Sequence, residues 1–107
     1  MHSGTSGWGV ITVDASGVTA TERIKLLKKD SVVLWKVRNN TRATITVGVG
    51  GFKPVKPIDR EPETTLAPNQ THEMSCLVAS GAVSGVYSYE IRVDGSYVTD
   101  PELEIPP

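Results

Sequence analysis

Three side chains that can bind metal ions alternate along one short stretch of the chain. His72, Met74 and Cys76 stand in the stretch THEMSC, residues 71–76. An imidazole, a thioether and a thiolate are together the ligand types that hold copper in electron-transfer sites. The spacing therefore raises the hypothesis of a metal site on a single segment.

Strand geometry argues against this hypothesis. Two residues of an extended strand rise by about 6.6–6.8 Å, so the β-carbons of His72 and Cys76 lie roughly 13 Å apart. With the metal–ligand bonds included, the two side chains span roughly 10 Å. A bulge or a ligand from elsewhere is needed, and the other histidine is His2, near the start of the chain. We therefore expect no metal and no cofactor, with Met74 and Cys76 in the core and His72 at the solvent-exposed end of a strand.

The remaining chemistry-bearing residues form no catalytic constellation. Asp100, Glu102 and Glu104 alternate near the end of the sequence, as the solvated edge of a strand does. The stretch GVGG, residues 48–51, follows a strand, but no helix or lysine–hydroxyl pair completes a phosphate-binding loop. We expect a protein that is not an enzyme. A small accessory domain of an enzyme system, using the acidic series, is an alternative.

Length and composition indicate one globular domain. The chain has 107 residues, of which 38% are hydrophobic and 21% charged. No apolar run approaches the roughly 18 residues of a membrane span, and no basic segment followed by an apolar one marks a signal peptide. Cys76 is the single cysteine, which excludes an internal disulfide. We expect no membrane partner and a cytoplasmic protein, or a secreted or periplasmic one if a leader was removed.

The charges are segregated along the chain. Residues 23–60 carry ten basic and two acidic side chains, a net charge of +8, whereas residues 61–107 carry one basic and eight acidic side chains, a net charge of −7. Strands from the two halves that lie side by side would neutralise each other. A bipolar surface would instead favour self-association or steer a charged partner.

Apolar and polar residues alternate with a period of two along most of the chain, which is typical of half-buried antiparallel strands. The dipeptide Asp94–Gly95 marks a hairpin. Seven strands at this spacing predict an all-β sandwich or barrel. The predicted strands are residues 8–13, 20–28, 32–39, 43–49, 71–78, 86–93 and 96–105.

We expect a single domain over residues 1–107, with a flexible N-terminus at 1–7 and a long proline-rich loop at 50–69. The four prolines of this loop exclude a central strand or a regular helix, and loops of this length often have a function. The isoelectric point near 6.1 and the lack of interleaved aromatic residues argue against nucleic-acid binding. The candidate binding residues are Phe52, Lys53, Lys56 and Arg60 in the loop, and Lys36, Arg38 and Arg42 outside it.

The order of these features resembles that of cupredoxins. KKDSVVLWKVRNNT is similar to the stretch in which an acidic turn leads into V-x-W-x-(V/N)-x-N. LAPNQTHEMSCLV is similar to the P-G-x-(S/T) turn before the strand that precedes the copper loop. GVYSYEIRVDG is similar to the G-x-Y-x-(Y/F) strand, and DPELEI stands where the closing strand does. The resemblance covers residues 8–105 and implies a seven-stranded Greek-key sandwich. An immunoglobulin-like sandwich is the alternative, although the Cys and Trp pattern of that class is missing.

In the same comparison, the positions that hold the copper ligands of cupredoxins are occupied by other residue types in this chain. Thr44 and Ile45 stand where the first histidine belongs, and Glu90 and Ile91 stand near the position of the cysteine. The stretch RVDGSYVTDPE supplies neither the second histidine nor the methionine. We therefore expect a metal-free cupredoxin-like sandwich that acts as a non-enzymatic binding or assembly module, with a protein partner or a second copy of itself. A degenerate copper site used in electron transfer is the alternative.

Overall fold

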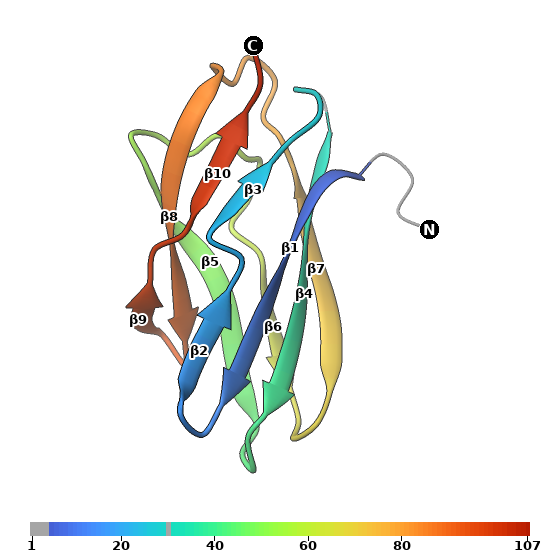
Figure 1. Ribbon diagram of the computed structural model, residues 1–107, viewed down its shortest axis with the longest axis vertical. Helices are drawn as coiled ribbons and strands as arrows, with labels where there is room; N and C mark the ends of the chain where they lie inside the picture. The colour runs from blue at the N-terminus through green and yellow to red at the C-terminus, as the bar shows by residue number, and fades with distance from the viewer. Residues whose placement is uncertain (1–4, 30) are drawn as a thin grey trace.

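The computed structural model describes residues 5–29 and 31–107. These residues form ten strands and no helix, so none of them forms a helix able to cross a membrane. The strands build two sheets that pack face to face (Figure 1). The expected all-β sandwich is confirmed.

The first sheet, called sheet A, has four strands in the order β2-β1-β4-β7. Strands β1 and β4 run parallel, and the other two contacts are antiparallel. The bounds are β1 Thr5–Asp14, β2 Gly17–Ala20, β4 Val32–Asn40 and β7 Thr71–Leu77.

The second sheet, called sheet B, has the order β3-β10-β8-β5-β6, and β9 also pairs with β8. The first half of β8 pairs with β10 and its last three residues pair with β9. The bounds are β3 Arg23–Lys25, β5 Ile45–Lys53, β6 Glu63–Leu66, β8 Gly85–Val93, β9 Ser96–Thr99 and β10 Glu102–Ile105.

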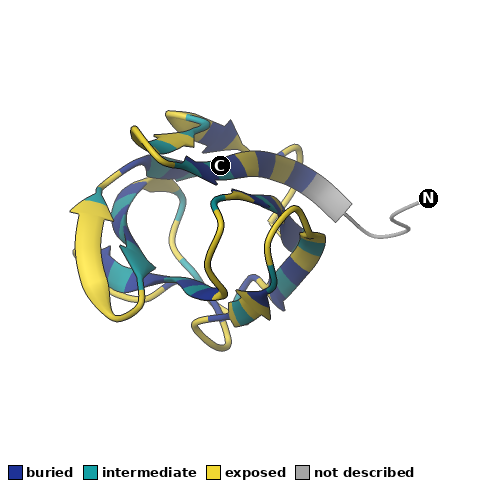
Figure 2. Ribbon diagram, turned by 90° about the horizontal axis from the view of Figure 1, so that it is seen from below, coloured by how far each residue is buried: buried dark blue, intermediate teal, exposed yellow. Residues whose placement is uncertain are grey.

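Alternation along the strands places the predicted apolar faces inside the sandwich. Buried and exposed residues alternate visibly along several strands (Figure 2). Trp35 of sheet A and Tyr89 of sheet B meet at the centre, with ring centroids 5.8 Å apart in an edge-to-face arrangement. Phe52 stacks on the other side of Tyr89 at 5.1 Å. These three rings therefore join the two sheets through the core.

Two predicted strands are each broken into two. The predicted strand 20–28 splits at Thr21 and Glu22, so that β2 lies in sheet A and β3 in sheet B. The predicted strand 96–105 splits at Asp100–Pro101 into β9 and β10. Proline lacks the N–H that continuous pairing requires, which accounts for the second break.

The predicted loop 50–69 is wrong in its bounds. Strand β5 continues to Lys53, and residues 63–66 form β6. Because β6 pairs only with β5 and fits between Pro62 and Pro68, it is an edge strand that the prolines tolerate. The chain thus returns to sheet B before residues 67–70 carry it over to β7 in sheet A.

Strand β1 begins inside the expected flexible N-terminus. Residues 5–7 of the expected flexible terminus belong to β1, and residues 1–4 lie outside the described residues. Gly9 lets β1 approach β3, because a β-carbon there would lie 2.8 Å from Cδ1 of Ile24. This close approach closes one side of the sandwich.

Candidate functional site

The side chains of Met74 and Cys76 lie in the core. Both belong to β7 and are buried, with 6% and 3% of their surface exposed. Burial raises the pKa of the Cys76 thiol from 9.0 to about 12, and Asp59 adds to the shift while Arg60 opposes it. The thiol therefore stays protonated at neutral pH, whereas a metal ligand must be a thiolate.

His72 is half-buried between the two sheets and is not a free surface residue. Its Nδ1 atom lies 2.9 Å from the hydroxyl oxygen of Thr64 on β6. The imidazole thus links the edge strand of sheet B to β7 of sheet A. This contact occupies one of the two ring nitrogens that could bind a metal.

The donor set does not fit a copper centre of the cupredoxin type. Within residues 5–29 and 31–107, no group of three or more His, Cys, Asp or Glu side chains could hold a metal ion. Ile45 and Ile91 are packed in the core with 6% and 0% of their surface exposed. Glu90 accepts a hydrogen bond of 2.8 Å from Arg92 on the same strand. His2 lies outside the described residues.

A buried asparagine organises the end of the sandwich where the resemblance places the copper ligands. The amide nitrogen of Asn39 donates to the carbonyls of Ala43 at 2.8 Å and Leu66 at 3.0 Å. Its Oδ1 accepts the backbone N–H of Thr41 at 2.9 Å. The sequence analysis did not single out Asn39, which ends the predicted strand 32–39. The signal available was a polar residue at an inward position of β4.

Phe52 and Arg60, two loop residues expected to bind a partner, both contact other parts of this chain, but only Phe52 is buried and Arg60 stays exposed. Phe52 is buried against Tyr89, so the expectation that it serves as a surface contact is wrong. Arg60 donates to the carbonyl of Ser75 at 3.3 Å, along the outer edge of β7. Lys53 and Lys56 are exposed, as surface contacts must be.

The segment 58–60 covers an edge of sheet A. Ile58 forms a bridge with Val78, and Asp59 exchanges hydrogen bonds of 2.9 Å with the backbone of Leu77 through its N–H and its carboxylate. Exposed strand edges are sites of unwanted pairing, and covering them prevents it. This part of the proline-rich loop therefore protects β7.

The other basic candidates are scattered. Lys36 is exposed on the outer face of sheet A. Arg38 donates to Oδ1 of Asn40 at 2.7 Å and to the hydroxyl of Thr71 at 3.1 Å. Arg42 is exposed in the β4–β5 turn. The exposed Lys53 ends β5 of sheet B, and the exposed Lys56 lies in the loop after it.

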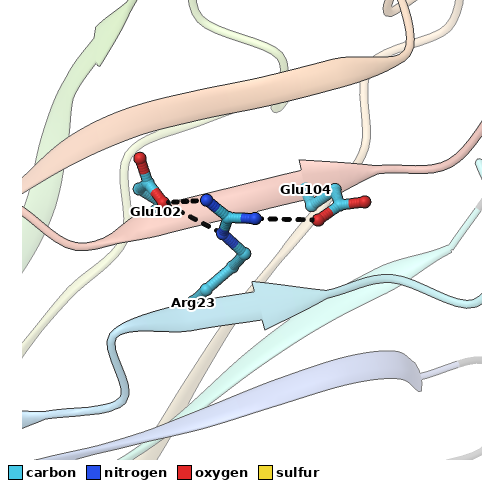
Figure 3. A network of polar contacts seen from close by, with 3 residues as sticks. All are labelled: Arg23, Glu102 and Glu104. Atoms are coloured by element: carbon cyan, nitrogen blue, oxygen red, sulfur yellow. Dashed lines mark hydrogen bonds and ion pairs between the residues drawn. The ribbon is translucent and has the colours of Figure 1, made fainter.

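Two members of the acidic series, Glu102 and Glu104, lie on β10 and pair with one arginine, whereas Asp100 precedes the strand. Arg23 on β3 lies between Glu102 and Glu104 (Figure 3), at 2.9 Å from Nε to the former and 3.4 Å from Nη1 to the latter. The two carboxylates raise the pKa of the guanidinium, Glu102 most. Here strands from the basic and acidic halves lie side by side and neutralise each other.

An exposed aromatic residue that sequence reasoning did not single out stands on the outer face of sheet A. Trp8 has 58% of its surface exposed. It borders a hollow of about 250 Å³ that Leu34, Lys36 and Glu73 also line. The signal was present in β1, where Trp8 and Val10 alternate with the inward residues.

Comparisons with known proteins define the fold. No family model matches the chain, and no curated protein matches it. The solved structure of dithionite-reduced auracyanin from Roseiflexus castenholzii matches with a TM-score of 0.58 and 10% identity, over 97% of this chain and 100% of that one. Auracyanin is a cupredoxin. The protein is therefore a cupredoxin-like β-sandwich that lacks the copper ligands among its described residues.

Proposed function

We propose that this chain is a non-enzymatic binding and assembly module in which two copies associate through the outer face of sheet A. The observation that carries the proposal is Trp8, a large aromatic side chain with 58% of its surface exposed on the outer face of sheet A. Aromatic residues of this kind are enriched at protein interfaces. Val10 of the same strand is also exposed. Leu34 of the neighbouring strand β4 is the cross-strand partner of Trp8 and is buried.

Covering Trp8 stabilises a dimer through the hydrophobic effect. A tryptophan buries 150–250 Å² in a core or interface, so covering its exposed part removes roughly 100 Å² from water. At about 25 cal/mol per Å², this contributes ~2–3 kcal/mol for each copy. The hollow beside Trp8 leaves space for a side chain of the second copy.

The charges beside Trp8 are complementary to themselves. Lys36 on β4 and Glu73 on β7 are cross-strand neighbours of opposite sign. If a two-fold axis places Lys36 of one copy opposite Glu73 of the other, symmetry also forms the reciprocal contact. The same face can therefore meet itself without repulsion.

Sedimentation velocity over a range of protein and salt concentrations tests the proposal. We expect a dimer that Trp8→Ser converts to a monomer, while Leu27→Ser leaves it unchanged. Leu27 is a matched control because it is 85% exposed but lies in the loop after β3. A wild-type chain that stays monomeric at high concentration and low salt contradicts the proposal.

A charge exchange separates contact between copies from contact within one copy. Lys36→Glu alone and Glu73→Lys alone each place like charges opposite each other in a homodimer, so each should weaken it. An equimolar mixture of the two variants restores opposite charges at both contacts, and we expect the mixed dimer to form. A mixture that remains as monomeric as its components argues against this interface.

Copper binding or electron transfer is the second candidate function, and the cupredoxin-like fold is what suggests it. The supporting observation is the match to auracyanin, whose structure was determined after reduction with dithionite. The ligand positions and the protonated Cys76 thiol do not support it. Addition of Cu(II) separates the two candidates, because a thiolate charge-transfer band in the visible spectrum would support the second.

A further inference from the structure

The outer edge of β2 has free backbone groups. Strand β2 follows β1 through the turn at Ala15–Ser16, so that Asp14 pairs with Gly17. At the other end of the ladder, Thr21 donates its N–H to the carbonyl of Val10 at 3.0 Å, which marks this pair as hydrogen-bonded. Hydrogen-bonded and non-hydrogen-bonded pairs alternate in an antiparallel ladder. The N–H and C=O groups of Val18 and Ala20 therefore point away from β1.

A hollow of about 590 Å³ lies against this edge. Val18 and Ala20 line one side, and Thr99, Asp100 and Pro101 line the other, at the junction of β9 and β10. Figure 1 shows β2 beside β9 and below β10 on this side of the sandwich. No ladder joins β2 to either strand, so the two sheets diverge here.

Two other edges of the sandwich, those of β7 and β3, are covered at least in part. Residues 58–60 cover β7 near its end. The edge of β3 approaches β1, where Gly9 contacts Ile24. An open edge facing a hollow is the arrangement that accepts an added strand from a partner. Strand β2 has four residues, so the added segment pairs over about 13 Å.

The rim of the hollow is acidic. Glu22 and Asp100 are exposed, and none of the ion pairs in the described residues includes them. Glu102 lies beside them and shares Arg23 with Glu104. Burial and then the nearby carboxylates of Asp100 and Glu90 raise the pKa of Tyr97 on β9, which agrees with a negative potential here.

We propose that the edge of β2 and the adjoining hollow bind an extended peptide segment rich in Lys and Arg, which adds to sheet A as a further strand. Backbone hydrogen bonds to Val18 and Ala20 supply the pairing. Glu22 and Asp100 select basic side chains by charge complementarity. This inference concerns a different surface from the self-association proposed above and does not depend on it.

A labelled hexapeptide of alternating lysine and valine tests the proposal, with the glutamate–valine hexapeptide as its counterpart. Fluorescence anisotropy measures binding, and ¹⁵N–¹H spectra of the protein locate it. We expect the basic peptide to bind and to shift the amides of Val18 and Ala20. Equal affinity for the acidic peptide, or shifts confined to other residues, overturns the proposal.

Variants of the rim test the charge selection. Surface charge pairs contribute about 0.2–1 kcal/mol each, so Glu22→Gln combined with Asp100→Asn should raise the Kd about twofold to thirtyfold. Glu63→Gln removes an exposed carboxylate on β6, away from the hollow, and should leave the Kd unchanged. Equal effects of the two changes contradict a specific acidic rim.

Backbone pairing is tested from both partners. Ala20→Pro removes an N–H that points away from β1, so it should abolish binding while the edge strand tolerates the proline. If this variant does not fold, the basic peptide methylated on alternate backbone nitrogens replaces it as the test. Unchanged affinity of the methylated peptide shows that charge alone holds it and overturns the added strand.

Discussion

Trp35 donates its indole N–H to the hydroxyl of Tyr89 across the core, at 3.1 Å. The two residues come from opposite sheets, and both side chains have 1% of their surface exposed. A buried donor without an acceptor is costly, so this bond determines how the sheets are aligned. Phe52 stacks on the same tyrosine and holds its ring in place.

Replacing Tyr89 with Phe should destabilise the protein by about 1–3 kcal/mol, because the indole N–H loses its acceptor in the core. Urea unfolding followed by tryptophan fluorescence measures the change. Tyr97→Phe is the control, since Tyr97 is 57% exposed and should change stability by less than about 0.5 kcal/mol. Equal losses in the two variants would show that the buried bond contributes nothing measurable.

Stability should fall at alkaline pH. Burial raises the pKa of Tyr89 to about 12 and that of the Cys76 thiol also to about 12, from ordinary values of 10.0 and 9.0. Both groups are neutral in the folded state, so their contribution is fully present below pH 9 and is lost as pH rises from 9 to 12. Thermal unfolding between pH 7 and pH 12 checks this. Cys76→Ala should flatten the slope between pH 9 and pH 12, and an unchanged slope contradicts the assignment.

Addition of Cu(II) should produce no thiolate charge-transfer band in the visible spectrum. The reason is that Cys76 is buried and protonated, and the one described imidazole bonds to Thr64. Native Cys76 should also react slowly with a thiol reagent and quickly in denaturant. A visible band that disappears in Cys76→Ala would restore the copper-binding function and remove the argument for a metal-free module.

Replacing Asn39 with Ala should cost about 2–4 kcal/mol, because the carbonyls of Ala43 and Leu66 lose their donor and the N–H of Thr41 loses its acceptor. Urea unfolding gives the value. Asn40→Ala is the matched control, because Asn40 is the next residue of the chain and its side chain is exposed. A loss no larger than that of the control would mean that the network does not hold this end of the sandwich.

Much of the local structure could be predicted from particular residues. The period-two alternation predicted half-buried strands at 32–39 and 86–93, in which Trp35 and Tyr89 are buried, and Asp94–Gly95 marked the hairpin, where both residues have positive φ. Burial of Met74 and Cys76 also followed from their alternation. These features depend on neighbours within a few positions, and for this reason a local pattern is enough to detect them.

The candidate site could be predicted less well. Phe52 falls in the predicted loop 50–69 and is therefore expected on the surface, but β5 continues through it and its side chain is buried. The edge cover at Asp59 and Arg60 could not be foreseen, since both residues bond to a strand that begins eleven or more positions later. The exposure of Trp8 could not be foreseen either, because it depends on whether another layer of the structure covers the outer face of sheet A.

The sequence by itself determined that the chain forms an all-β sandwich, which side chains the clearly alternating strands turn inward, and that the positions matching copper ligands hold Thr44, Ile45, Glu90 and Ile91. Only the tertiary structure decided that the chain changes sheets at Thr21–Glu22 and that β2 faces the β9–β10 junction with its edge free. The physical reason is that alternation is a property of one strand. Sheet order and open edges arise instead from hydrogen bonds and packing between segments far apart in the chain.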